Sequence, residues 1–255
     1  MALTLFNAPQ STCSQRVRFV LAAKRLAFEE HRLDLFAGDQ LKPSYLALNP
    51  NGVVPTLVHD GAVVIDSSVI MEYLGEVFAE GPRFVPADPV VRARMRSLMR
   101  FIDEVPAPAI RVPSYNLAFL PHFQAMSEEA FRAMADSKPL RREFLLAMGR
   151  TGFPEAEMTL AVKRLEQTVV RMDEAIAASG GPFLLGRDPS LADISLMPVI
   201  VRMDDIRLAR LWASRPAVAA WLDAIRAQPA FGPTYYAGSL LTEKYPHLRE
   251  QLAAC

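Results

Sequence analysis

The pattern of apolar residues changes once along this chain, at a run of turn-forming residues between 82 and 89, Pro-Arg-Phe-Val-Pro-Ala-Asp-Pro. Before this run, short stretches of strand-like alternation are separated by stretches with a helical period. After it, apolar residues recur at helical spacing and no strand is predicted. We therefore expect an α/β domain over residues 1–81, a linker at 82–89 and an all-α domain over 90–255.

The first domain is expected to alternate strands and helices. Pro55 falls inside the third predicted strand, and proline there removes a hydrogen-bond donor from the sheet. An edge position and a cis peptide bond both remain open for this residue. The predicted strands are 3–7, 29–34, 53–58 and 62–65, and the predicted helices are 14–24 and 69–78, with a weak helix or irregular arm at 38–48.

The second domain is expected to contain helices only. Prolines at 106, 108 and 113 are expected to break or kink the chain after the first of them. The tail from Tyr235 is polar, and we expect it to be irregular with one short helix. The predicted helices are 90–104, 117–126, 127–136, 141–148, 155–179, 192–205 and 218–227.

Composition excludes several classes of partner. Lys plus Arg and Asp plus Glu both number 28, so the net charge of zero argues against nucleic acid or an anionic membrane. The two cysteines, Cys13 and Cys255, cannot form a disulfide framework, and they suit a reducing compartment. The four histidines show no metal-ligand spacing, so no metal site is expected. Without a signal peptide or a membrane-length apolar run, the chain is expected to be soluble and cytoplasmic.

The sequence Ser-Thr-Cys-Ser at 11–14 lies between the first predicted strand and the first predicted helix. The first turn of a helix offers unpaired N–H groups and about half a positive charge, and this environment favours a thiolate. Either Cys13 is that thiolate, or the site holds the thiol of another molecule. The simpler alternatives are that Ser11 or Ser14 only caps the helix and that Cys13 is a small buried apolar residue.

Four motifs together resemble the cytosolic glutathione S-transferase superfamily. They are Ser11–Arg18, Asn49–Leu57, Asp66–Leu74 and Phe183–Ile194. The resemblance implies a thioredoxin-like α/β domain followed by an all-α domain, glutathione as the cosubstrate, and a homodimer. Within the fourth motif, Ser190 and Asp193 have the spacing of a capping box, so we expect a structural role for them.

In serine-type members the first hydroxyl of the first motif stabilises the glutathione thiolate, and this residue corresponds to Ser11. Glutaredoxin-like members carry their attacking cysteine at that position, whereas here the thiol is displaced to Cys13. Because a hydroxyl forms no mixed disulfide, we expect chemistry in which glutathione itself is the nucleophile.

The resemblance also implies how glutathione is held. A cis Pro55 presents the backbone of Val54 to the cysteinyl part of the tripeptide. Asp66 and Ser67 correspond to the residues that hold the γ-glutamyl end, although both could serve only as helix caps. Gln40 and Lys42 lie where the family often contacts the glycine carboxylate.

The segment between 107 and 154 is longer than in compact members and resembles the bacterial glutathione-dependent β-etherase branch, which cleaves aryl ethers. In that branch the assisting hydroxyl corresponds to Ser14, so Ser11 and Ser14 both stay open. Tyr115, Phe119 and Phe123 are expected to bind an aromatic electrophile, or to pack in the core or at a dimer interface. The predicted activity is attack of a glutathione thiolate on an apolar, aromatic electrophile, which the sequence does not identify, with β-aryl ether cleavage as one form. The alternative is a non-catalytic ligand carrier or stress-response chaperone of the same fold.

Overall fold

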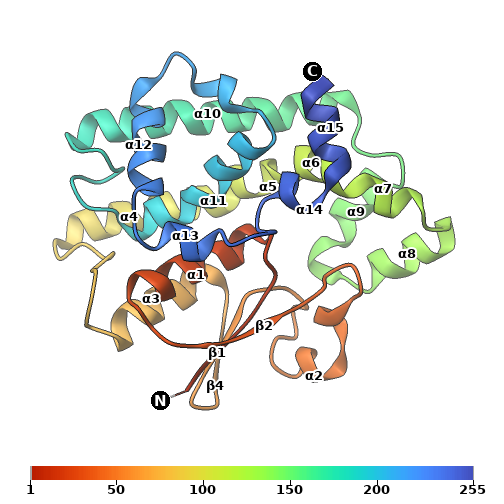
Figure 1. Cartoon of the computed structure of the whole chain (residues 1–255), viewed down its shortest axis with the longest axis horizontal. Coiled ribbons are helices and arrows are strands. Elements are labelled where there is room, and N and C mark those ends of the chain that lie inside the picture. Colours follow the sequence, from red (N-terminus) through yellow and green to blue (C-terminus); the bar gives the residue numbers. More distant parts are fainter. Residues whose placement is uncertain (1, 255) are drawn as a thin grey trace.

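The computed structural model describes residues 2–254, with side chains as far as Leu252, so Cys255 lies outside the described residues. A small mixed sheet occupies one end of the molecule, and a group of helices covers the other (Figure 1). Helices α1 (Thr12–Ala23) and α3 (Ser67–Val77) lie between the sheet and the remaining helices. The predicted fold class, a thioredoxin-like α/β domain followed by helices, is confirmed.

The sheet has the strand order β2-β1-β3-β4. Strand β2 runs parallel to β1, and the pairs β1–β3 and β3–β4 are antiparallel. A parallel pair requires a long crossover connection, which α1 supplies, whereas β3 and β4 are joined by the tight turn Asp60-Gly61. Both turn residues have positive φ, 48° and 88°. The strands are β1 (Leu3–Asn7), β2 (Glu29–Arg32), β3 (Thr56–His59) and β4 (Ala62–Ile65).

The third strand is shorter than the predicted 53–58. It begins at Thr56, directly after Pro55, and the Val54–Pro55 peptide bond is cis. Proline has no N–H to donate to the sheet, so the strand starts only after it. The cis bond that the family resemblance implied is therefore present, and the strand prediction at this point was wrong by three residues.

The first helix begins two residues earlier than predicted. Ser11 is its N-cap, and the Ser11 hydroxyl oxygen accepts a hydrogen bond from the Ser14 backbone N–H at 3.2 Å. The predicted arm at 38–48 contains the 3₁₀ turn η1 (Asp39–Leu41) and the short helix α2 (Pro43–Leu46). This arm lies at the edge of the sheet domain, next to the loop that carries Val54.

Helix α11 (Leu191–Asp205) forms the centre of the helical domain and packs against both α1 and α4 (Pro89–Glu104). Ser190 and Asp193 form the predicted capping box at its start. The fully buried Asp193 carboxylate accepts hydrogen bonds from Ser190, from the Leu184 N–H at 2.9 Å and from the Trp221 indole N–H at 2.8 Å. The structural role expected for this motif is confirmed. The outer helices are α10 (Glu155–Ser179) and α12 (Pro216–Arg226), with the 3₁₀ turn η4 (Ala209–Trp212) between α11 and α12.

The segment from 105 to 154 folds as a series of short helices. The predicted breaks at the three prolines are only partly correct, because Pro106 and Pro108 lie inside one short helix and Pro113 inside the next. Proline is tolerated in a first helical turn, where its missing N–H costs no helical bond. The elements are α5 (Pro106–Ala109), α6 (Arg111–Ser114), the π-helical turn η2 (Tyr115–Phe119), α7 (Leu120–Gln124), α8 (Glu128–Asp136), η3 (Pro139–Arg141) and α9 (Arg142–Met148).

The tail is more regular than predicted. Two short helices, α14 (Leu241–Lys244) and α15 (Pro246–Ala254), replace the single one expected, and the helix α13 (Phe231–Thr234) comes directly before the tail. Leu241 and Leu248 are fully buried in the main core, so a few apolar anchors fix a segment whose average composition is polar. No helix in residues 2–254 is long and apolar enough to cross a membrane.

Candidate active site between the two domains

A cavity of about 490 Å³ lies between part of the sheet domain and part of the helical domain, and we call it the interdomain cavity. From the sheet domain it is lined by residues 8–13, 32–36, 40 and 51–54. From the helical side its lining includes Ile110, Arg111, Ser114, Tyr115, Phe119, Phe123, Lys138, Arg141, Arg202 and Tyr245. The start of α1 and the aromatic side chains of the segment 105–154 thus line the same cavity.

The two candidate serines differ in their access to this cavity. Ser11 lines it and is partly exposed, whereas Ser14 is fully buried and its hydroxyl oxygen accepts a hydrogen bond from the Ala8 N–H at 3.4 Å. The Ser11 oxygen accepts from the Ser14 N–H, and its own hydrogen has no acceptor among the described residues. Cys13 also lines the cavity, as an unpaired thiol within the described part of the chain.

The loop before β3 presents its backbone to the cavity. The carbonyl of Val53 accepts hydrogen bonds from the Tyr45 hydroxyl at 2.5 Å and from the Asn49 side chain at 2.9 Å, which fixes the loop beside Val54. Gln40 lines the same region and is 4% exposed, and its Oε1 has no hydrogen-bond partner in the described structure. A buried unpaired acceptor costs free energy unless a ligand satisfies it.

Lys42 does not join Gln40 at the cavity. Its ammonium forms an ion pair with Asp39 at 2.7 Å, and its side chain is 64% exposed. The two residues proposed together for the glycine carboxylate are therefore separated, because the turn η1 buries the first and turns the second toward solvent.

Asp66 and Ser67 begin α3, outside the set of residues that line the cavity. Asp66 has a φ of 73°, and its carboxylate accepts hydrogen bonds from the Ser68 and Val69 N–H groups, at 2.9 and 3.3 Å. The buried Ser67 hydroxyl oxygen accepts a hydrogen bond from the Arg16 guanidinium at 3.4 Å. Both residues thus act as caps or structural contacts in this structure, and a role toward glutathione remains a proposal.

The three predicted aromatic residues come together on the helical side of the cavity. Tyr115 contacts Phe119 edge-on at 4.9 Å and stacks on Phe123 at 5.9 Å between ring centroids, and Phe36 from the sheet domain lies 5.4 Å from Phe119. Burial raises the pKa of Tyr115, so its hydroxyl stays neutral at physiological pH. The same rings pack against the small core around Phe131, so they both line the cavity and support its wall.

Several cationic residues in the lining were missed by the sequence analysis. Arg111, Lys138 and Arg141 come from the segment of short helices, where no periodic pattern indicates which side chains face inward. Burial lowers the pKa of Arg111, and the nearby Arg141 lowers it further. Arg202 of α11 is buried and donates to the Gln10 carbonyl at 2.6 Å, so it holds the loop that leads to Ser11.

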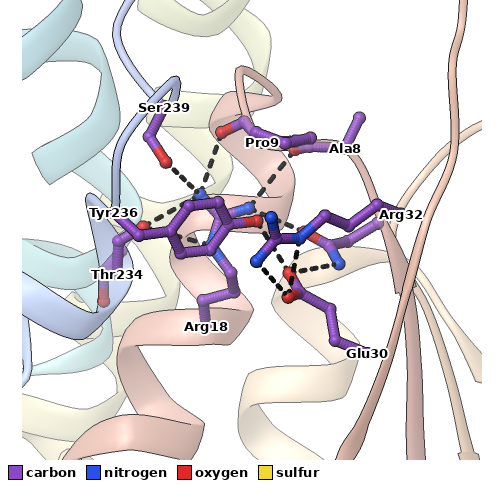
Figure 2. A network of polar contacts seen from close by, with 9 residues as sticks. Ala8, Pro9, Arg18, Glu30, Arg32, Thr234, Tyr236 and Ser239 are labelled. Carbon is purple, nitrogen blue, oxygen red and sulfur yellow. Dashed lines mark hydrogen bonds and ion pairs between the residues drawn. The ribbon is translucent and has the colours of Figure 1, made fainter.

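A second buried arginine fixes the other end of this loop. Figure 2 shows Arg18 of α1 pointing toward the loop and the C-terminal tail, where it donates to the carbonyls of Pro9 and Thr234, both at 2.9 Å. The ring of Tyr236 lies under two guanidinium groups, 4.7 Å from that of Arg18 and 4.2 Å from that of Arg32. The tail therefore holds the loop 8–10 in place, and its residues Lys244 and Tyr245 also line the cavity.

Comparison with known proteins agrees with this arrangement. Residues 10–77 match the family model of the glutathione S-transferase N-terminal domain, and residues 154–224 match that of the C-terminal domain. Protein LigF of Sphingobium sp. (strain NBRC 103272 / SYK-6) is 30% identical over 241 residues, which cover 90% of this chain and 91% of LigF. A maleylacetoacetate isomerase of Pseudomonas aeruginosa is 28% identical and covers 90% of this chain and 93% of its own length.

Solved structures give the same result. The crystal structure of the β-etherase LigF from Sphingobium sp. strain SYK-6 has a TM-score of 0.81 at 29% identity, and the match covers 92% of this chain and 99% of LigF. Glutathione transferase F7 from Populus trichocarpa has a TM-score of 0.70 at 27% identity, covering 91% and 97%. The chain therefore belongs to the glutathione S-transferase family, with glutathione as its cosubstrate.

Proposed function

We propose that this glutathione transferase attaches glutathione to an aromatic electrophile, and that β-aryl ether cleavage is its reaction. The observation that carries the proposal is the interdomain cavity, where the Ser11 hydroxyl at the start of α1 faces a space lined by Tyr115 and Phe119. A polar helix start on one side and an aromatic wall on the other suit a thiolate and an apolar substrate, respectively. The similarity to LigF over nearly the whole chain supports the ether as substrate.

In this proposal Ser11 stabilises the glutathione thiolate. Its hydroxyl hydrogen is free of acceptors in the described structure, so it can donate to the sulfur, and the first-turn N–H groups of α1 add their partial positive charge. The thiol loses its proton to solvent, and the thiolate then attacks the carbon of the C–O bond. A C–S bond forms, the C–O bond breaks, and the electron pair leaves with the aryl oxide, which takes up a proton.

The sheet domain would bind the rest of glutathione. The backbone of Val54, held in place next to the fixed Val53 carbonyl, suits the peptide of the cysteinyl residue. The unpaired Gln40 Oε1 would accept a hydrogen bond from the N–H of the glycine residue, while the Gln40 Nε2 donates to the Leu35 carbonyl at 3.3 Å. The start of α3 at Asp66 and Ser67 would face the γ-glutamyl end, since a helix N-terminus binds a carboxylate.

Three single substitutions test the role of Ser11. We expect Ser11→Ala to lower kcat/KM about 100-fold or more, because it removes the donor to the thiolate. Ser14→Ala is expected to lower the melting temperature rather than the rate, since Ser14 is buried away from the cavity. Cys13→Ala is expected to retain activity. The activity of all three variants is measured as the rate of phenol release from an aryl ether dimer at varied concentrations of glutathione.

The results separate the alternatives. Loss of turnover in Cys13→Ala with full activity in Ser11→Ala would overturn the mechanism. A wild-type protein that binds immobilised glutathione but turns over neither the ether, a nitroaryl halide nor an organic hydroperoxide would instead be a non-catalytic carrier of the same fold.

A further inference from the structure

The lining of the interdomain cavity carries an excess of positive charge. Among the described residues, six cationic side chains line it against the single carboxylate of Asp34. That carboxylate accepts hydrogen bonds from the Phe36 and Ala37 N–H groups at 2.9 and 3.1 Å, so it stabilises the turn that follows it. The cations are Arg32, Arg111, Lys138, Arg141, Arg202 and Lys244.

Two of these cations have structural partners close by. Arg32 forms an ion pair with Glu30 at 2.8 Å, and Arg202 donates to the Gln10 carbonyl at 2.6 Å. These contacts account for their place in the fold, so neither residue requires a ligand.

Arg111 and Arg141 lack such partners. Neither forms an ion pair within residues 2–254, and the hydrogen bond that Arg141 makes goes to the carbonyl of the preceding Leu140 at 3.0 Å. The two guanidinium groups lie close enough for Arg141 to lower the pKa of Arg111, in addition to the larger effect of burial. Partly buried like charges are unfavourable unless an anion lies between or beside them.

Both arginines lie beside the aromatic wall. Arg111 begins α6, one helical turn before Tyr115, and Arg141 ends η3, further along the same segment; both line the cavity. The charges of both act on the Tyr115 hydroxyl. Lys138 adds a third cation nearby, with its ammonium 3.5 Å from the Leu35 carbonyl across the cavity.

We propose that the electrophile of this enzyme is an aromatic molecule that carries a carboxylate, and that Arg111 and Arg141 bind this carboxylate while the ring packs on Tyr115 and Phe119. The inference rests on the proposed function and adds the substrate class to it. The carboxylate is unchanged by the reaction, since the bond that breaks is the C–O bond of the ether. Guanidinium groups suit this role because they bind carboxylates through two parallel hydrogen bonds.

A pair of product-like ligands tests the proposal without turnover. We suggest titration calorimetry with S-(4-carboxybenzyl)glutathione and S-benzylglutathione, which differ only in the carboxylate. The wild-type protein is expected to bind the carboxylated ligand about tenfold more tightly than the uncharged one. In Arg111→Gln and in Arg141→Gln this preference should disappear, so that the two ligands bind about equally. Arg111→Lys should retain part of it. The matched control is Arg132→Gln, which removes the same charge from an exposed position on α8 of the same segment.

Each outcome has a distinct meaning. Equal binding of the two ligands by the wild type, or a preference that persists in both glutamine variants, overturns the carboxylate site. An equal loss of affinity for both ligands in Arg111→Gln would show that the arginines hold glutathione itself, which also overturns it. Failure of the wild type to bind either ligand would count against the proposed function rather than against the choice of substrate class.

Discussion

Glu30 joins the sheet domain to the C-terminal tail through a single carboxylate. It accepts hydrogen bonds from Arg32 at 2.9 Å and from the Tyr236 hydroxyl at 2.7 Å (Figure 2). The Asn7 amide donates a third hydrogen bond to it at 3.0 Å. Burial alone would raise the pKa of Glu30, but these hydrogen bonds together lower it below its usual value. The carboxylate is therefore more acidic in the folded than in the unfolded state, and its ionised form stabilises the fold.

This difference predicts a pH dependence of stability. The contribution of Glu30 is fully present above the unfolded pKa of about 4.3 and is lost as the pH falls through the lower folded pKa. We expect Glu30→Gln to lower the free energy of unfolding at pH 7 and to differ progressively less from the wild type below about pH 4. Urea unfolding across this pH range measures the difference in the free energy of unfolding between variant and wild type. The control is Glu29→Gln, a substitution at an exposed neighbour. A difference that stays constant with pH would refute the assignment.

Single residues in this site were predictable where a local motif determines them. The sequence predicted a serine cap at 11 or 14 and a capping box at Ser190 and Asp193, and the structure has the cap at Ser11 and the box as predicted. Arg111 and Arg141 were not predictable in the same way. Their orientation toward the cavity depends on how several short, proline-containing helices pack together. The spacing of apolar residues along the sequence does not indicate this packing.

At the scale of elements, the turn between α10 and α11 depends on a close backbone approach at Gly181. A Cβ atom built there would lie 2.2 Å from the carbonyl oxygen of Gly186 and 2.8 Å from the N atom of Arg187. The same turn places the Leu184 N–H on the Asp193 carboxylate, so it fixes the start of the central helix. Because the close atoms belong to the backbone, they cannot move aside without disturbing the turn.

Gly181→Ala is therefore expected to destabilise the fold by about 1–3 kcal/mol, the usual cost of overpacking. The matched control is Gly232→Ala, because the structure places no heavy atom within 4 Å of a Cβ at Gly232 and alanine favours a helix. Thermal unfolding of the two variants beside the wild type gives the comparison. Equal melting temperatures for all three proteins would contradict the prediction, because they would show that the turn accommodates the Cβ atom at position 181 without loss of stability.

The elements themselves were predicted unevenly. Long helices with an apolar stripe, such as Glu155–Ser179, are found at the predicted bounds, because many residues contribute to the same period. The prediction of a single short helix in the tail was wrong, because α14 and α15 are each held by one or two buried leucines in an otherwise polar segment. One or two buried leucines produce no periodic pattern in the sequence, so these helices become evident only in the folded structure.

At the scale of the whole molecule, the candidate active site lies between elements that are far apart in the sequence. The fold class and its order of domains were predictable from the four motifs, each of which is local. The shape and charge of the interdomain cavity were not, because they result from the contact of residues 8–13 with the segment 105–154 and with the tail. Because the proposed function places the electrophile in this cavity, we expect the electrophile to differ among relatives that share the motifs.

The homodimer remains a prediction, and exposed valines on β4, α3 and α4 are candidates for its interface. Val63, Val69 and Val90 are 42%, 55% and 60% exposed, on β4, α3 and α4, and α3 and α4 are neighbours joined by the Glu72–Arg96 ion pair at 2.7 Å. A two-fold interface buries the same patch on both copies.

We expect sedimentation to give twice the mass of one chain, and Val69→Glu with Val90→Glu to shift the protein toward the monomer. Each introduced carboxylate would lose water at the interface without a counterion, which costs several kcal/mol. The control is Leu160→Glu, at a 41% exposed residue of α10, on a helix distant in sequence from the valines. If the wild type sediments as a monomer, or if the control dissociates as readily as the double variant, the face formed by α3 and α4 is not the interface.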